Sequence, residues 1–162
     1  MNCKYPEIGL LEISDVTTGN SNTVDAVDDG KYPFYDRSRT IKRSNKYLFD
    51  EEAIIIPGEG QEFIPKYIKG KFDLHQRAYA VFPKECVIGK YLYYAIMYKK
   101  AHFAQIAVGS TVKSLRLDSF KILNVPYPDV HIQKKIADFL SILDELIEKN
   151  NAINDYLFHH LR

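Results

Sequence analysis

The fold is decided by one stretch near the end of the sequence, residues 125–162, which reads VPYPDVHIQKKIADFLSILDELIEKNNAINDYLFHHLR. Each proline lacks a backbone donor and disfavours the helical conformation of the residue before it, so Val125-Pro126-Tyr127-Pro128 predicts a stop in regular structure. Asp129 is a good N-cap, and neither Gly nor Pro follows it. We therefore expect a single helix over residues 130–162, about 33 residues and about 50 Å long.

Apolar residues on this expected helix recur with the alternating spacing of four and three that is typical of a coiled-coil seam. A domain of the size that precedes the helix is about 30 Å across, so the helix is expected to project beyond it and to need a partner helix. The alternative is that the stripe packs on the chain's own domain. Asn150 is the polar member of the seam, and we hypothesise that it penalises misaligned helix registers. The seam consists of Ile132, Ile136, Phe139, Leu143, Leu146, Asn150, Ile153 and Leu157.

The rest of the chain predicts a mixed α/β domain over residues 1–128, followed by the long helix over residues 129–162. Residues 53–56 and 79–82 are apolar, β-favouring runs that end at Pro57 and Pro83, which is typical of strands. Residues 86–100 place apolar side chains at helical spacing and predict a helix. The expected fold is a twisted sheet with short helices and one C-terminal coiled-coil helix.

The composition favours an ordinary globular protein. The chain has 162 residues, of which 46% are hydrophobic and 27% charged, which suits about one domain. No signal peptide or long apolar run is recognisable, so a cytoplasmic location without membrane contact is expected. Cys3 and Cys86 are too few for a disulfide framework or a four-ligand zinc site, and no metal site is expected.

Catalytic motifs are missing from the sequence. It contains no glycine-rich nucleotide loop, Walker loop or His-Glu-x-x-His. The run 124–127, NVPY, resembles the catalytic loop of amino-methyltransferases, but Val125 replaces its first proline and no glycine-rich cofactor loop accompanies it. Pro128-Asp129 could begin a nuclease metal motif, but no Asp/Glu-x-Lys follows. We expect no catalytic residue and no bound cofactor.

Basic residues are concentrated locally although the net charge is only +1. The run 36–47, DRSRTIKRSNKY, is rich in Lys and Arg and is expected to form a loop. Such side chains can neutralise phosphates or pair with base edges, and DNA contact is favoured over a merely solvated loop for the cluster. A second candidate stretch lies at residues 69–77, and a third, weaker one at residues 109–113. The candidate DNA-binding residues are Arg37, Arg39, Lys42, Arg43, Lys71, Gln76, Arg77, Thr111 and Lys113.

An ordered set of short motifs resembles the target recognition domain of type I restriction-modification specificity subunits. The motifs are GKYPFY at 30–35, EAIIIPGEG at 52–60, GKF at 70–72, YLYY at 91–94, GST at 109–111, PYP at 126–128, QKKIA at 133–137 and LDELI at 143–147. They span nearly the whole chain. Family members usually contain two recognition domains joined by two antiparallel helices, whereas this chain has one domain and one helix, so the resemblance implies a half-length form.

The resemblance implies recognition of double-stranded DNA without catalysis. An antiparallel homodimer through the long helix would rebuild the family's two-domain shape and read an inverted repeat. A separate methyltransferase subunit, which would bind S-adenosylmethionine, is the implied partner, and a restriction subunit would supply cleavage. Two other functions stay open at this point: a stand-alone dimeric DNA-binding regulator, and a coiled-coil module for protein assembly.

Overall fold

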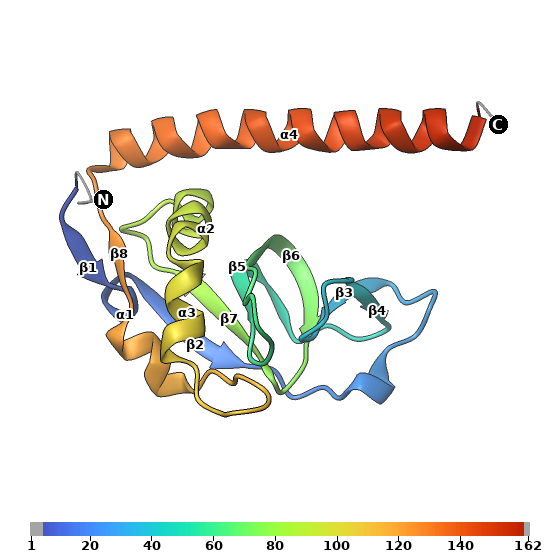
Figure 1. Ribbon diagram of the computed structural model, residues 1–162, viewed down its shortest axis with the longest axis horizontal. Helices are drawn as coiled ribbons and strands as arrows, with labels where there is room; N and C mark the ends of the chain where they lie inside the picture. The colour runs from blue at the N-terminus through green and yellow to red at the C-terminus, as the bar shows by residue number, and fades with distance from the viewer. Residues whose placement is uncertain (1–4, 161–162) are drawn as a thin grey trace.

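The computed structural model describes residues 5–160, in which a mixed α/β domain is followed by one long helix (Figure 1). The expected mixed α/β fold is thereby confirmed. In chain order the elements are β1 (Glu7–Gly9), α1 (Leu10–Ile13), β2 (Ser14–Thr18), η1 (Thr23–Asp25), β3 (Tyr32–Tyr35), β4 (Lys42–Ser44), β5 (Phe49–Pro57), β6 (Lys66–Leu74), β7 (Ala78–Pro83), α2 (Gly89–Tyr98), α3 (Lys100–Ile106), η2 (Leu117–Ile122), β8 (Asn124–Pro126) and α4 (Val130–His160).

Six strands form the main sheet in the order β2-β7-β5-β6-β3-β4, and β1 pairs with β8 in a separate ribbon. Neighbouring strands are antiparallel except β3 and β6, which are parallel. The strands expected at residues 53–56 and 79–82 lie within β5 and β7, so both predictions are confirmed.

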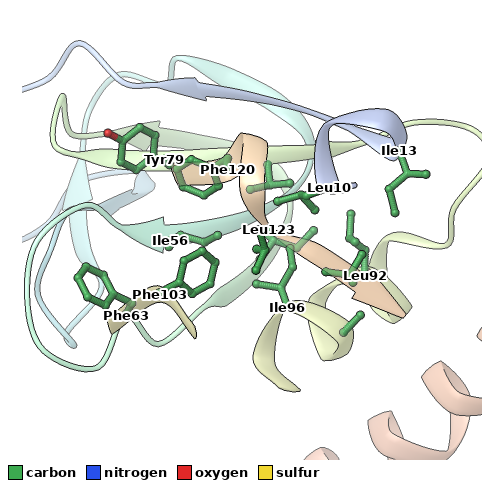
Figure 2. Packing of buried hydrophobic residues seen from close by; sticks show 14 of the residues in the cluster. Leu10, Ile13, Ile56, Phe63, Tyr79, Leu92, Ile96, Phe103, Phe120 and Leu123 are labelled. Atoms are coloured by element: carbon green, nitrogen blue, oxygen red, sulfur yellow. The ribbon is translucent and has the colours of Figure 1, made fainter. Parts of the chain in front are cut away.

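The side chains of β5 alternate between two apolar clusters, as the two-residue period of a strand requires. Ile54 and Ile56 belong to the larger cluster, which the helices cover, while Ala53 and Ile55 belong to a smaller cluster on the other face. Figure 2 shows the larger cluster, in which side chains of the helices and of the segment before β8 pack against the sheet. Its fully buried members include Leu10, Leu92, Ile96, Phe103, Phe120 and Leu123.

The helix expected over residues 86–100 begins later than the sequence suggested. α2 starts at Gly89, and Lys100 belongs to α3. The Ile88 amide is bound by the Gln133 side chain of α4 at 3.0 Å, which holds the chain just before α2 in an extended conformation. A Cβ on Gly89 would come within 2.3 Å of Glu52 Oε1, so glycine leaves room at the start of α2 for the Glu52 carboxylate of β5.

The expected stop at residues 125–128 is wrong for its first half. Val125 and Pro126 belong to β8, and Val125 is fully buried in the larger cluster. Pro126 pairs with Glu7 in a two-stranded ribbon, where a strand without one donor is tolerated because the ribbon has a free edge. The break in regular structure is therefore confined to residues 127–129.

The long helix is confirmed, and its N-cap is Asp129. Asp129 Oδ1 accepts hydrogen bonds from the amides of His131 at 3.0 Å and Ile132 at 3.1 Å, which is the geometry of an N-cap. α4 then continues for 31 residues to His160, about 46 Å. The expected end at Arg162, like Cys3, lies outside the described residues.

Candidate nucleic-acid interface

Arg37 and Arg77 lie far apart in the sequence but bind the two oxygens of one carboxylate. Arg37 Nη1 lies 2.5 Å from Glu59 Oε2, and Arg77 Nη1 lies 2.8 Å from Glu59 Oε1. The Glu59 side chain is 16% exposed, whereas the two arginine side chains are 56% and 58% exposed. We refer to these three residues as the Glu59 cluster. It presents two guanidinium groups to solvent over a mostly covered carboxylate.

Backbone hydrogen bonds fix the Glu59 cluster to the sheet. Glu59 follows β5 directly, and Arg77 lies in the turn between β6 and β7. The Gly58 amide donates to the Arg77 carbonyl oxygen at 2.9 Å, and a Cβ on Gly58 would lie 2.4 Å from that oxygen. Only glycine allows this approach. The Gly60 amide donates to the Lys113 carbonyl oxygen at 3.0 Å, which ties in the third candidate stretch.

The charge of Glu59 is stabilised by its two arginines. Partial burial opposes ionisation and tends to raise the pKa of Glu59, but the hydrogen bonds and charges of Arg37 and Arg77 together outweigh it and hold the pKa below its ordinary value. Glu59 is therefore ionised at neutral pH. Two arginines against one carboxylate leave the cluster positively charged.

Lys42 and Arg43 use their side chains for contacts within the domain. They lie in β4 and not in the expected loop. Lys42 Nζ is 2.7 Å from Asp36 Oδ2, and Asp36 is 4% exposed. Burial tends to raise the pKa of Asp36, but hydrogen bonds from Lys42 and Ser38 outweigh it and lower that pKa. Arg43 donates from Nε and Nη2 to the carbonyl oxygens of residues 30 and 31, both at 2.9 Å. These contacts give both residues structural roles.

Arg39, Lys71 and Gln76 are exposed and have weaker contacts. Arg39 forms an ion pair with Glu62, in which both side chains are more than half exposed. Lys71 lies on β6, with its Nζ 3.8 Å from Asp50 Oδ2 and 4.6 Å from the centre of the Tyr47 ring. Gln76 precedes Arg77 in the same turn and donates from Nε2 to the Asn22 side chain. The neighbouring Phe72 and Leu74 are fully buried in the core.

The structure brings together residues from all three candidate stretches. One pocket is lined by Arg37, Arg39 and Glu59, and a second by Glu59, Gln76 and Arg77. Thr111 and Lys113 lie in the exposed loop between α3 and η2, and the backbone of Lys113 is bonded to Gly60. The candidates therefore converge around Glu59, apart from Lys42, Arg43 and Lys71.

Sequence reasoning missed Lys66 and Arg116, which line these two pockets. Lys66 Nζ donates to the Ser38 carbonyl oxygen at 2.6 Å. Burial lowers the pKa of Lys66, and the nearby Asp36 opposes this effect. Arg116 is exposed at the rim of the second pocket. Both are isolated basic residues outside the basic run, so local charge density gave no signal for them.

From Phe139 onward the predicted seam of α4 lies on the face that points away from the domain, whereas Ile136 packs against the larger cluster. Because each residue advances a helix by about 100°, the seam centres about 130° from Gln133 and Ala137, which are the buried residues of α4. Phe139 is 63% exposed and Leu146 50% exposed. Ile132 and Ile136 are partly buried, and from Glu145 to His160 every residue is exposed. The alternative in which the whole stripe packs on the domain is therefore wrong for this chain.

A different face of α4 docks on the domain. Gln133 Oε1 accepts from the Ile88 amide at 3.0 Å, and its Nε2 donates to the Pro128 carbonyl oxygen at 2.9 Å. Tyr94 of α2 donates to Asp144 Oδ2 at 2.7 Å. Burial and then Asp144 raise the pKa of Tyr94 to about 12, so its hydroxyl group stays protonated at neutral pH. Docking ends at this tyrosine contact, and α4 runs on along the domain (Figure 1).

Among residues 5–160, no helix is long and apolar enough to cross a membrane. Within the same residues, no three His, Cys, Asp or Glu side chains are grouped so that they could hold a metal ion.

Two solved structures share the fold. The S subunit of the type I restriction-modification system from M. genitalium matches with a TM-score of 0.79 and 22% identity, over 99% of this chain and 46% of that chain. The HsdS subunit from Thermoanaerobacter tengcongensis matches with a TM-score of 0.66 and 11% identity, over 90% of this chain and 38% of that chain. Both likenesses confirm the mixed α/β fold with a long C-terminal helix.

Curated relatives match over most of this chain but over only part of their own length. The type I restriction enzyme EcoDI specificity subunit of Escherichia coli is 29% identical over 148 residues, 91% of this chain and 33% of the relative. The type I restriction enzyme MjaIX specificity subunit of Methanocaldococcus jannaschii is 28% identical over 121 residues, 74% of this chain and 28% of the relative. The chain thus spans one third or less of these relatives.

The family model described as Type I restriction modification DNA specificity domain matches residues 8–157, which is nearly the whole chain. The residue motifs, the fold and this match agree, and the chain belongs to the family of type I restriction-modification DNA specificity domains.

Proposed function

We propose that this chain reads one half of a two-part DNA target through the surface around Glu59. The observation that carries the proposal is the convergence of basic and polar side chains from separate loops on that surface. Phosphate contacts position a protein on DNA, while arginine and glutamine side chains can read bases. The proposed DNA-contacting residues are Arg37, Arg39, Gln76, Arg77, Thr111 and Lys113, with Lys71 at the margin and Lys42 and Arg43 holding the loop.

The chain itself is not a catalyst. Specificity subunits of type I systems recognise DNA and leave catalysis to other subunits, so membership of this family confirms the prediction that the chain is not an enzyme. We propose that a separate methyltransferase subunit binds S-adenosylmethionine and modifies adenine near the recognised bases. The chain would then need no cofactor of its own.

The exposed seam of α4 supports pairing with a second copy of the chain. Two such helices packed antiparallel would place one recognition domain at each end of the pair. The spacing of the two half-targets would follow from the length of the paired helices. Two identical domains related by a two-fold axis would read an inverted repeat.

The proposal is tested on a randomised duplex library in two ways: binding of the chain, with and without the methyltransferase subunit, at several salt concentrations, and adenine methylation by that subunit, with and without the chain. The mass of the chain in solution is measured alongside. We expect methylation at a two-part inverted repeat only when both proteins are present, and a dimeric chain. DNA binding with no effect of the methyltransferase subunit would favour a stand-alone regulator. Weak DNA binding without salt dependence would favour the protein-assembly module.

A further inference from the structure

The surface around Glu59 carries two electrostatically different kinds of basic side chain. Arg37 and Arg77 share the Glu59 carboxylate. Arg116 lines the pocket beside them, and Lys113 is joined to Gly60 through its backbone. Neither Lys113 nor Arg116 forms an ion pair with any of residues 5–160. The same surface therefore offers arginines whose charge is partly compensated by one shared carboxylate, and basic side chains that form no ion pair with residues 5–160.

The shared carboxylate makes Arg37 and Arg77 poor phosphate ligands. A phosphate that approached either guanidinium would also meet the charge of Glu59 close by, and like charges at short range repel. Backbone bonds at Gly58 and Gly60 fix the main chain on both sides of Glu59, and its two ion pairs hold the carboxylate between the arginines. An arginine that is already paired with a carboxylate also neutralises a phosphate less fully, so it releases fewer of the counterions condensed on the DNA, and that release is the main gain from a phosphate contact.

The ion pairs with Glu59 leave both arginines well suited to bind uncharged hydrogen-bond acceptors, such as those on base edges. In each guanidinium the contact with Glu59 uses Nη1, which leaves other N–H donors of the planar group for a ligand. The ion pair restricts a long side chain before DNA arrives, which lowers the entropy that binding must overcome. Guanine presents two neutral acceptors, O6 and N7, in the major groove, and arginine is their commonest partner.

We infer that Arg37 and Arg77 read guanine base edges while Lys113 and Arg116 contact phosphates. Glu59 is then a positioning residue, which holds both guanidinium groups and turns phosphates away from them. The inference rests on the DNA recognition proposed above, and it assigns different tasks to neighbouring cations.

The experiment measures the affinity of the chain, with its methyltransferase subunit, for the selected duplex and for single-base-pair variants across a range of salt concentrations. Arg77→Lys keeps the charge but removes the planar fork. We expect it to reduce the preference for guanine about 10- to 100-fold at one base pair in each half-target, with an unchanged salt slope. Arg37→Lys is expected to do the same at a different base pair.

The phosphate contacts are expected to respond in the opposite way. Lys113→Ala or Arg116→Ala in each half should weaken binding to all sequences alike and should reduce the salt slope by about 1 per contact. Base preference should not change. These side chains are exposed, so thermal unfolding of each variant checks that the fold is intact.

Glu59→Gln tests both roles of Glu59, which are to position the two arginines and to repel phosphates. It keeps a hydrogen-bond acceptor but removes the charge, so the salt slope should rise and the guanine preference should fall. Glu62→Gln is the matched control, because Glu62 pairs with Arg39 at a more exposed position. It should leave the guanine preference unchanged.

Two results would overturn the inference, and they differ from each other. If Arg37→Lys and Arg77→Lys keep the guanine preference, or if Glu59→Gln changes neither slope nor preference, the division of tasks is wrong while DNA recognition stands. If neither the wild-type chain nor any variant binds a duplex, with or without the methyltransferase subunit, the proposed function itself fails.

Discussion

The two halves of α4 differ in which face they use and in what those faces are made of. The first half, up to Asp144, docks on the domain through Gln133, Ala137 and the hydrogen bond from Tyr94. The second half, from Glu145 to His160, is exposed throughout, and its seam residues Leu146, Ile153 and Leu157 pack against neither apolar cluster of the domain. A single helix thus packs one face, with Gln133 and Ala137, on its own domain and leaves a second, apolar face exposed, which we propose pairs with a partner helix.

We call the face with the seam the outer face of α4 and the face with Gln133 and Ala137 the inner face. Apolar periodicity predicts the outer face but not the inner one. The inner face depends on an amide side chain with both of its polar ends bound, and on an alanine that lets the helix approach closely. Neither contributes to a hydrophobic repeat. Changes to either face should therefore have separable effects, on association for one and on stability of the folded chain for the other.

The largest expected effect comes from charge on the outer face. In Leu143→Asp/Leu146→Asp, carboxylates would have to be buried between paired helices, which costs several kcal/mol unless the pair separates. We expect the dimer to become a monomer in sedimentation equilibrium, with its thermal unfolding barely changed, because both leucines are exposed within one chain. Glu148→Arg, on the exposed polar side of the same turn, is the control and should stay dimeric. A double variant with unchanged mass would rule out this seam.

The next effect comes from the inner face. Gln133→Leu leaves the buried Ile88 amide and Pro128 carbonyl without their side-chain partner, which should lower the free energy of unfolding by about 1–3 kcal/mol. Urea unfolding at a fixed protein concentration measures the change. Lys135→Leu, at an exposed position in the same turn, should leave the free energy of unfolding almost unchanged. If both variants unfolded alike, the amide would not be what docks the helix.

Asn150→Leu tests whether the polar residue of the seam sets the register of the paired helices. Extra apolar contact should stabilise the dimer by about 1–2 kcal/mol, and loss of the polar pairing should admit parallel or shifted helices. Cross-linking from a single cysteine placed near the end of α4, in a Cys3→Ser/Cys86→Ser background, distinguishes the orientations. A more stable dimer with a single unchanged orientation would mean that Asn150 does not set the register.

Tyr94→Phe has the smallest effect, about 0.5–1.5 kcal/mol, because it removes one half-buried hydrogen bond to Asp144. The folded pKa of about 12 lies above the ordinary value of 10.0, so the contribution of Tyr94 is complete below pH 10 and is lost as the pH rises toward 12. Urea unfolding at pH 7 and at pH 11 tests this. The difference between wild type and variant should shrink at the higher pH, and a constant difference would remove Tyr94 from the docking contact.

The sequence predicted the elements that are set by local patterns. The proline-led helix, the Asp129 cap and the strands within β5 and β7 follow from periodicity and capping chemistry. The pairing of Pro126 with Glu7 could not be foreseen, because it joins the two ends of the domain.

The candidate site was predictable only in part. The basic run at residues 36–47 led to Arg37, but the run alone does not say that Arg37 and Arg77 meet on Glu59, since β-sheet pairing brings them together. Lys66 and Arg116 carry no local signal, and Lys42 and Arg43 belong to the run yet are held by the domain. Charge density along a sequence finds a segment, whereas the fold decides which of its side chains face a ligand.

The most direct test of the two-faced helix compares the DNA targets selected from a randomised duplex library by the wild-type chain and by Leu143→Asp/Leu146→Asp, each with the methyltransferase subunit. The wild type should enrich two half-targets as an inverted repeat with a fixed gap, and the seam variant should enrich one half-target at most. If the seam variant selected the same spaced repeat as the wild type, the outer face of α4 would not set the target, and the account would be contradicted.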